Sequence, residues 1–269
     1  MEQATPHRFV VSEGFRRLVE RNAPLWGGEA EVIGTYFRSP QRNAASDRLW
    51  ILRQMYKEYW DGIVPPLAAI QRALPQLERE TTRAQLLELT EVLHEEVEHY
   101  GMFAELHDRL RDPGQPAPDP ETLKREGGWP ENDTLMGVRA RHRREHGALG
   151  HRAYQFTEGG YCTLFSEGMK LKGQGGINDL IARVCTHIYH DEFEHMLLGI
   201  TGVDDSSMSS ADWQRLADMT VEQLQYRIRM RNAQFGFPVP EARIVELLAG
   251  KAAPMPFDYA LAEKLRGRR

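Results

Sequence analysis

Cysteine is scarce in this sequence, and its scarcity excludes several classes of metal-binding and cross-linked protein. The two cysteines are Cys162 and Cys185, and no C-x-x-C pair occurs anywhere in the 269 residues. A disulfide framework needs several cysteines, whereas a zinc ribbon or a rubredoxin-type iron centre needs paired C-x-x-C ligands. All three are therefore excluded.

The sequence also lacks long apolar runs and an excess of positive charge. No segment approaches the ~20 apolar residues that span a bilayer, and residues 1–20 hold no stretch typical of a signal peptide. The net charge of −5 and the pI near 6.1 give no electrostatic footprint for nucleic acid. We interpret the basic run at 139–144 (RARHRR) as a solvated helix start. We expect a cytoplasmic protein that neither enters a membrane nor binds nucleic acid.

Strand signals are equally scarce, whereas apolar residues recur at helical spacing over most of the chain. Pro65-Pro66 should kink or break one of the helices, and the Pro/Gly-rich stretch 112–130 predicts a long irregular connection. The expected helices cover residues 12–21, 45–74, 82–111, 148–171, 178–199, 211–232 and 241–249.

Two helical hairpins joined by one long crossover have the connectivity of a ferritin-like four-helix bundle. We therefore predict an all-α protein with a single domain over residues 1–269. Its core bundle should cover about 45–199, with the long crossover between the second and third bundle helices. Additional helices should lie at the N-terminus and at about 211–250.

A six-residue motif, H-(E/D)-E-(V/F)-E-H, occurs twice, at 94–99 and at 190–195. Each copy contains Glu-x-x-His, which places a carboxylate and an imidazole one turn apart on the same helix face. Two such pairs facing each other would offer hard oxygen and borderline nitrogen donors to a pair of transition-metal ions. The duplicated motif therefore predicts a metal site.

Hairpin geometry selects the carboxylates that could complete this site. In an antiparallel pair, residues at equal depth lie equally far from the turn, which favours Glu158 opposite Glu192 and Glu58 opposite Glu96. Asp61 lies on the same face as Glu58 and remains an alternative to it. The side chains expected to converge are Glu58, Glu96, His99, Glu158, Glu192 and His195.

Two glycines, Gly159 and Gly160, follow Glu158 directly and lower the helix propensity there. They are consistent with space for substrate beside the metal ions or with a local distortion of the helix. They are equally consistent with close packing of two helices. Both interpretations stay open at the level of sequence.

The pattern E…E-x-x-H…E…E-x-x-H, with an acid directly before each motif Glu, resembles the ferritin-like di-iron carboxylate superfamily. It is most similar to the oxygen-activating members: multicomponent monooxygenase hydroxylases, acyl-carrier desaturases, arylamine N-oxygenases and ribonucleotide reductase small subunits. The resemblance covers about residues 45–199. It implies that Glu95 supports His195 and that Asp191 supports His99, fixing each imidazole from behind.

This resemblance implies a non-haem di-iron oxygenase or oxidase that uses O2 to oxidise a small organic substrate. The cofactor would be two iron ions, with a manganese–iron pair as the alternative. Since no flavin, nicotinamide or iron–sulfur motif occurs, an external electron-donor protein would be required. Tyr189 could face the metals and tune the oxidant, or could be an ordinary core aromatic.

Two other functions share the same ligand pattern. One is iron storage or oxidation without an organic substrate. The other is tRNA modification by di-iron chemistry, which the acidic balance of the chain disfavours although the basic run at 139–144 could contact a phosphate backbone. A homodimer is one candidate assembly.

Overall fold

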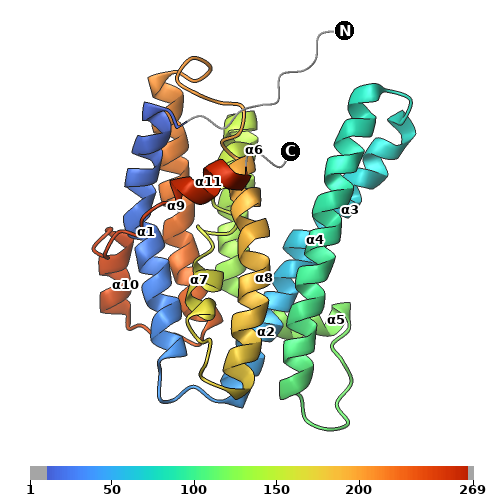
Figure 1. Ribbon diagram of the computed structural model, residues 1–269, viewed down its shortest axis with the longest axis vertical. Coiled ribbons are helices and arrows are strands. Elements are labelled where there is room, and N and C mark those ends of the chain that lie inside the picture. The colour runs from blue at the N-terminus through green and yellow to red at the C-terminus, as the bar shows by residue number, and fades with distance from the viewer. Residues whose placement is uncertain (1–10, 266–269) are drawn as a thin grey trace.

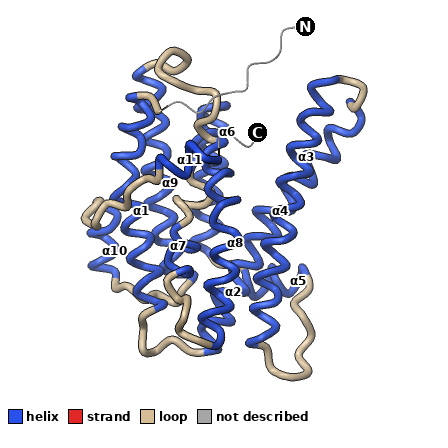
Figure 2. The backbone as a smooth tube through the Cα atoms, in the orientation of Figure 1, coloured by secondary structure: helices blue, strands red, loops and turns tan. Residues whose placement is uncertain are grey.

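The computed structural model describes residues 11–265, and over this range the chain consists of helices and loops without a strand (Figure 2). The predicted all-α class is confirmed. None of the helices in the described range combines the length and the apolar character needed to cross a membrane.

The two copies of the motif lie on two long helices near the middle of the molecule. Helix α4 packs on α2 and α3, helix α8 packs on α6 and α7, and α4 and α8 meet each other (Figure 1). Helices α1 and α9 lie side by side and cover α6 and α7 on the side away from α4. The bounds of these helices are α1 Glu13–Phe37, α2 Ala44–Lys57, α3 Val64–Ala73, α4 Glu80–Leu110, α6 Pro130–Phe156, α7 Thr163–Met169, α8 Gly176–Leu198 and α9 Ser210–Gln234.

Shorter elements connect or cover these helices. The largest apolar core contains residues from α1, α2, α4 and α6 to α11, and it leaves a polar centre between α4 and α8. The shorter elements are the π-helix η1 Glu58–Ile63, the 3₁₀ turn η2 Leu74–Gln76, α5 Pro120–Thr122, the π-helix η3 Leu123–Gly127, α10 Glu241–Leu248 and α11 Tyr259–Leu265.

The first helix is longer than predicted. Helix α1 continues to Phe37 through Pro24, Gly27 and Gly28, so its expected end at residue 21 is wrong. These glycines allow close approach to other elements. A Cβ on Gly27 would lie 2.0 Å from a backbone oxygen after α10, and one on Gly28 would lie 3.1 Å from a side chain of α9. Packing of the apolar face of α1 therefore outweighs the low helix propensity of these residues.

The helix predicted at residues 148–171 begins earlier and ends earlier than expected. Helix α6 starts with Pro130 in its first turn, where the missing N–H is tolerated, and it ends at Phe156 rather than near residue 171. The run 139–144 lies in the middle of α6, and Arg139 and His142 are only 2% and 3% exposed. Its predicted place at a helix start is therefore wrong, and the run is solvated only in part, because Arg143 and Arg144 are exposed.

The chain between α2 and α3 passes through η1 without a break in the helical path. Pro65 and Pro66 lie in the first turn of α3, where proline costs little, and the wide π-turn lies directly before them. The predicted disturbance thus takes the form of a π-turn. Such turns are rare and occur frequently at functional sites, and this one carries Glu58.

Candidate metal centre

The two Glu-x-x-His motifs face each other between α4 and α8. The ring centroids of His99 and His195 lie 6.4 Å apart, and both side chains are buried. Two groups of side chains bring their ligand atoms within 4.8 Å of one another, and both groups include Glu192. The groups are Glu58, His99 and Glu192, and Glu96, Glu192 and His195.

Glu96 lies between the two imidazoles. Its Oε2 is 4.0 Å from Nδ1 of His99, and its Oε1 is 3.7 Å from Nδ1 of His195. The two oxygens of one carboxylate thus face two different imidazoles. A carboxylate in this place, like Glu192, can serve two metal positions at once.

Each imidazole is held from behind by the acid of the other motif copy. Nε2 of His99 lies 3.2 Å from Oδ2 of Asp191, and Nε2 of His195 lies 2.8 Å from Oε2 of Glu95. Since a carboxylate accepts the hydrogen of Nε2, the Nδ1 atom faces the centre in both residues. Nδ1 of His99 is buried and has no hydrogen-bond partner. An orphaned imidazole nitrogen beside buried carboxylates fits a metal ion.

The electrostatics of the centre favour a bound cation. Burial raises the pKa of Glu58, with the charge of Glu192 adding to it. Burial also raises the pKa of Glu96 well above its ordinary value, with Glu58, Glu192 and Glu158 adding to it. A divalent ion between these carboxylates would compensate the negative charge that burial disfavours. These buried clusters can therefore hold a metal ion.

The pKa of His195 is also shifted by the buried carboxylates of the centre. Burial alone would lower its pKa, but the hydrogen bond to Glu95 and the charges of Glu192 and Glu158 raise it to about 9. In the metal-free protein a proton therefore occupies the Nδ1 side that faces Glu96. A metal ion at this place would displace that proton.

Glu58 enters the centre from η1, and two residues near it were missed by the sequence analysis. Nε2 of Gln54 donates to Oε1 of Glu58 at 2.6 Å and orients this carboxylate. A Cβ on Gly62 would lie 2.3 Å from Oε2 of Glu96, so any residue other than glycine would displace the Glu96 carboxylate. Gln54 precedes Glu58 by one helical turn, a spacing that could have revealed it.

Glu158 and Asp61 lie outside both groups. Oε1 of Glu158 accepts a hydrogen bond from the Tyr154 hydroxyl at 2.7 Å. Asp61 accepts a hydrogen bond at 3.3 Å from Asn132 on α6. Of the two alternatives in η1, Glu58 and Asp61, the structure thus brings Glu58 into the centre. Sequence reasoning also missed Tyr154, which precedes Glu158 by one turn.

The chain distorts directly after Glu158. Gly160, Tyr161 and Cys162 all have positive φ, which separates α6 from α7. A Cβ on Gly159 would lie 2.9 Å from Oε2 of Glu192, and one on Gly160 would overlap the Arg227 guanidinium. The glycine pair thus coincides with a distortion of the chain and with close packing, and the space at both glycines is filled by side chains of α8 and α9.

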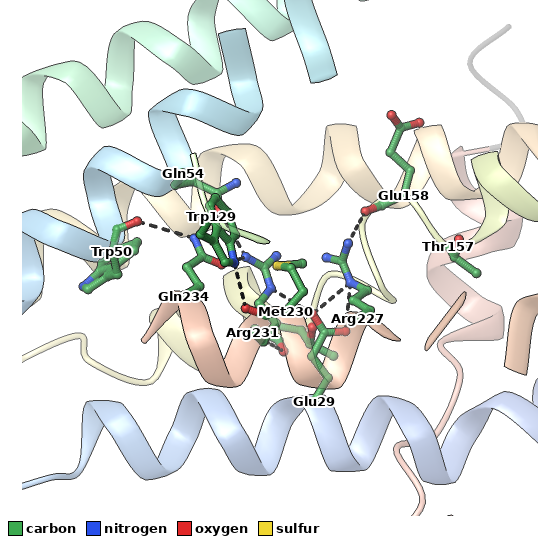
Figure 3. Close-up of polar contacts among 12 residues, drawn as sticks. Glu29, Trp50, Gln54, Trp129, Thr157, Glu158, Arg227, Met230, Arg231 and Gln234 are labelled. Atoms are coloured by element: carbon green, nitrogen blue, oxygen red, sulfur yellow. Dashed lines mark hydrogen bonds and ion pairs between the residues drawn. The ribbon is translucent and has the colours of Figure 1, made fainter. Parts of the chain in front are cut away.

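A buried ionic network supports the centre from the side of α1 and α9 (Figure 3). The Glu29 carboxylate is 0% exposed and accepts hydrogen bonds from Nε of Arg227 at 2.8 Å and Nε of Arg231 at 2.9 Å. Arg231 also donates to Oε1 of Gln54 at 3.1 Å, which in turn holds Glu58. The network therefore links α1, α9 and α2 to a candidate ligand.

The remaining residues singled out from the sequence lie outside the centre. Tyr189 packs on the Phe193 ring at 6.3 Å, and burial raises its pKa to about 12. Cys162 and Cys185 are buried free thiols, and burial raises the pKa of Cys185 to about 12. Neither cysteine belongs to the two ligand groups found among the described residues.

Comparison of the chain with models of protein families, with curated proteins and with solved structures finds no match. The functional inference therefore rests on the centre itself. The described residues contain two overlapping, buried Glu/His clusters between all-helical elements, and these clusters could hold a metal ion.

Proposed function

We propose that this chain is a ferritin-like, non-haem di-iron protein that uses O2 to oxidise a small organic substrate. The bundle in this proposal consists of α2 with η1, α4, α6 and α8. The metal ligands would be Glu58, Glu96, His99, Glu192 and His195, with Glu158 beside them. An external protein would supply the electrons.

One observation carries the proposal. Each motif imidazole receives its hydrogen-bond partner from the opposite copy of the motif, and both Nδ1 atoms are thereby directed at Glu96 and Glu192. These pairs, His99 with Asp191 and His195 with Glu95, are not expected on a solvated amphipathic face. Burial of carboxylates costs several kcal/mol unless a cation compensates their charge. The crossed pairs support a dinuclear metal site over ordinary surface charge.

The chemistry assigned to the bound metals is reductive activation of O2. The residues of this chain supply geometry and exclude water. Asp191 and Glu95 fix the imidazoles, Gln54 fixes Glu58, and buried side chains around the clusters keep solvent away. A ligand set with two imidazoles favours oxygen activation over iron storage, which typically uses fewer histidines.

The alternative of tRNA modification loses its main support in the structure. In the basic run at 139–144, Arg139 is buried and donates to the backbone oxygen of Thr157 at 2.7 Å. Arg141 pairs with Glu222 at 2.6 Å. Two of the four arginines in the run thus serve contacts within the protein, and only Arg143 and Arg144 remain exposed.

Metal analysis of matched variants tests the proposal. The protein is loaded with Fe²⁺ without oxygen, desalted and analysed for iron beside Glu192→Gln and Glu98→Gln. Wild type should retain about two irons per chain, and Glu192→Gln should lose both because Glu192 belongs to both groups. Glu98→Gln is the control, since Glu98 lies in the same motif but is largely exposed. Equal iron content in the wild type and Glu192→Gln would refute the proposal.

Oxygen consumption then separates the enzyme from an iron-handling protein. The loaded protein is reduced and exposed to O2 with a panel of small organic compounds. Consumption that depends on one compound class supports an oxygenase or oxidase. Consumption that depends only on added Fe²⁺, with many irons taken up per chain, would instead identify an iron-handling protein.

A further inference from the structure

The two positions of the candidate centre are unequal. We define the first position by Glu58, His99 and Glu192, and the second position by Glu96, Glu192 and His195. Glu58 gives the first position a carboxylate of its own. The second position shares Glu192 with the first, and its other carboxylate, Glu96, also lies 4.0 Å from Nδ1 of His99. The expected counterpart of Glu58, Glu158, belongs to neither group.

We propose that Tyr154 is a positioning residue that holds Glu158 away from the second position and so makes the second metal ion bind more weakly than the first. This inference rests on the proposed function. It concerns the loading of the same centre and not its chemistry.

The hydrogen bond that holds Glu158 is short and comes from a firmly placed side chain. The Tyr154 hydroxyl donates to Oε1 of Glu158 at 2.7 Å. The Tyr154 ring lies against two guanidinium groups of α6, Arg139 at 5.1 Å and Arg143 at 5.0 Å from its centroid. These cation–π contacts keep the ring in place. A carboxylate bound to such a donor needs a competing interaction to leave it.

The main chain around Glu158 is fixed independently of its side chain. Arg139 donates to the backbone oxygen of Thr157 and Arg227 donates to that of Glu158, both at 2.7 Å. Figure 3 shows the Glu158 carbonyl facing Arg227 while its side chain points away from that guanidinium. Rotation about side-chain bonds can therefore redirect the carboxylate while the turn stays in place.

Glu158 is also near enough to the second position to serve it. The next residue, Gly159, borders Glu192 so closely that a Cβ would lie 2.9 Å from its Oε2. The Glu158 carboxylate also lies close enough to Glu96 and His195 to interact electrostatically with both. The Glu158 carboxylate therefore lies near the second position, but it is hydrogen-bonded to Tyr154.

Titration with Co²⁺ under anaerobic conditions tests the inference, because calorimetry resolves two binding steps and the Co²⁺ absorption reports changes in coordination. Wild type should bind one ion tightly and a second at least tenfold more weakly. Tyr154→Phe keeps the ring between the arginines and should strengthen only the second step, by about tenfold for one hydrogen bond to a charged group. Tyr189→Phe is the matched control and should leave both steps unchanged.

A double variant ties the effect to Glu158. Adding Glu158→Gln to Tyr154→Phe should abolish the gain, because the freed side chain then carries no charge. The inference is overturned if the two wild-type steps are equal, if Tyr154→Phe leaves the second step unchanged or weakens it, or if the gain persists in the double variant. Absence of any Co²⁺ binding by wild type would instead overturn the proposed function, and the inference with it.

Discussion

Replacement of Gly62 by alanine should empty the centre without unfolding the protein. A Cβ at this position lies 2.3 Å from Oε2 of Glu96, whereas ordinary contact begins at 3.4 Å, so the carboxylate must retreat by about 1 Å. Metal–ligand distances hold within about 0.2 Å. Since loss of a supporting residue behind a ligand already costs about 10–100-fold in metal affinity, displacing a ligand should cost about 100-fold or more.

The same substitution should not destabilise the metal-free protein. Alanine is favoured over glycine inside a helix by about 0.5–1 kcal/mol, and the atom that must move is the end of a flexible side chain. The melting temperature of metal-free Gly62→Ala should therefore equal that of wild type or exceed it by roughly 2–4 °C. Stability and metal affinity thus change in opposite directions.

Gly101→Ala provides the control. Gly101 also lies in a helix beside the candidate ligands, two residues after His99, but a Cβ there meets no atom within 4 Å. It should gain the same small stability and keep full metal affinity. The assay is anaerobic Fe²⁺ titration with thermal unfolding of all three proteins. Full Fe²⁺ affinity in Gly62→Ala, or an equal loss in Gly101→Ala, would refute the geometry assigned to Glu96.

Three further predictions follow from the buried charges. Because the folded metal-free protein raises the pKa of Glu58, Glu96 and His195, these groups stabilise it at low pH and lose that effect as the pH rises through their raised values. The difference in melting temperature between the metal-loaded and metal-free protein should thus widen from pH 5.5 to pH 8, and a constant difference would contradict this. Glu29→Gln should lower the free energy of unfolding by about 3–5 kcal/mol in urea titration, since it leaves two buried arginines without their carboxylate; a change below 1 kcal/mol would count against the network. Asp191→Asn should weaken metal binding by about 10–100-fold in calorimetry at unchanged stability, and unaltered affinity would show that Asp191 does not support the ligand.

The helical class and the position of the motif helices follow from local patterns. Apolar residues recur at helical spacing in α4 and α8. On such a helix, the Glu and His of Glu-x-x-His lie on the same face, one turn apart. The approach of His99 to His195, and the crossed support by Glu95 and Asp191, were therefore accessible from the resemblance.

Other features depend on contacts that no local pattern contains. The first helix was expected to end at residue 21, but α1 continues past it, and its glycines lie where other elements approach the helix. The helix predicted to begin at residue 148 is part of α6, which begins at Pro130 and has a kink at Gly147, where φ is 52°. The placement of Glu158 depends on a hydrogen bond to Tyr154 and on a turn with positive φ. The hairpin argument therefore predicted that Glu158 lies near the centre, but it could not predict the direction of the Glu158 carboxylate.

The anomalous scattering of an iron-loaded crystal, measured at the iron absorption edge, tests the central claim most directly. The account predicts two iron peaks between α4 and α8, one beside Nδ1 of His99 and one beside Nδ1 of His195, with Glu192 in contact with both. Iron peaks located elsewhere, or imidazoles turned away from the shared carboxylates, would contradict it.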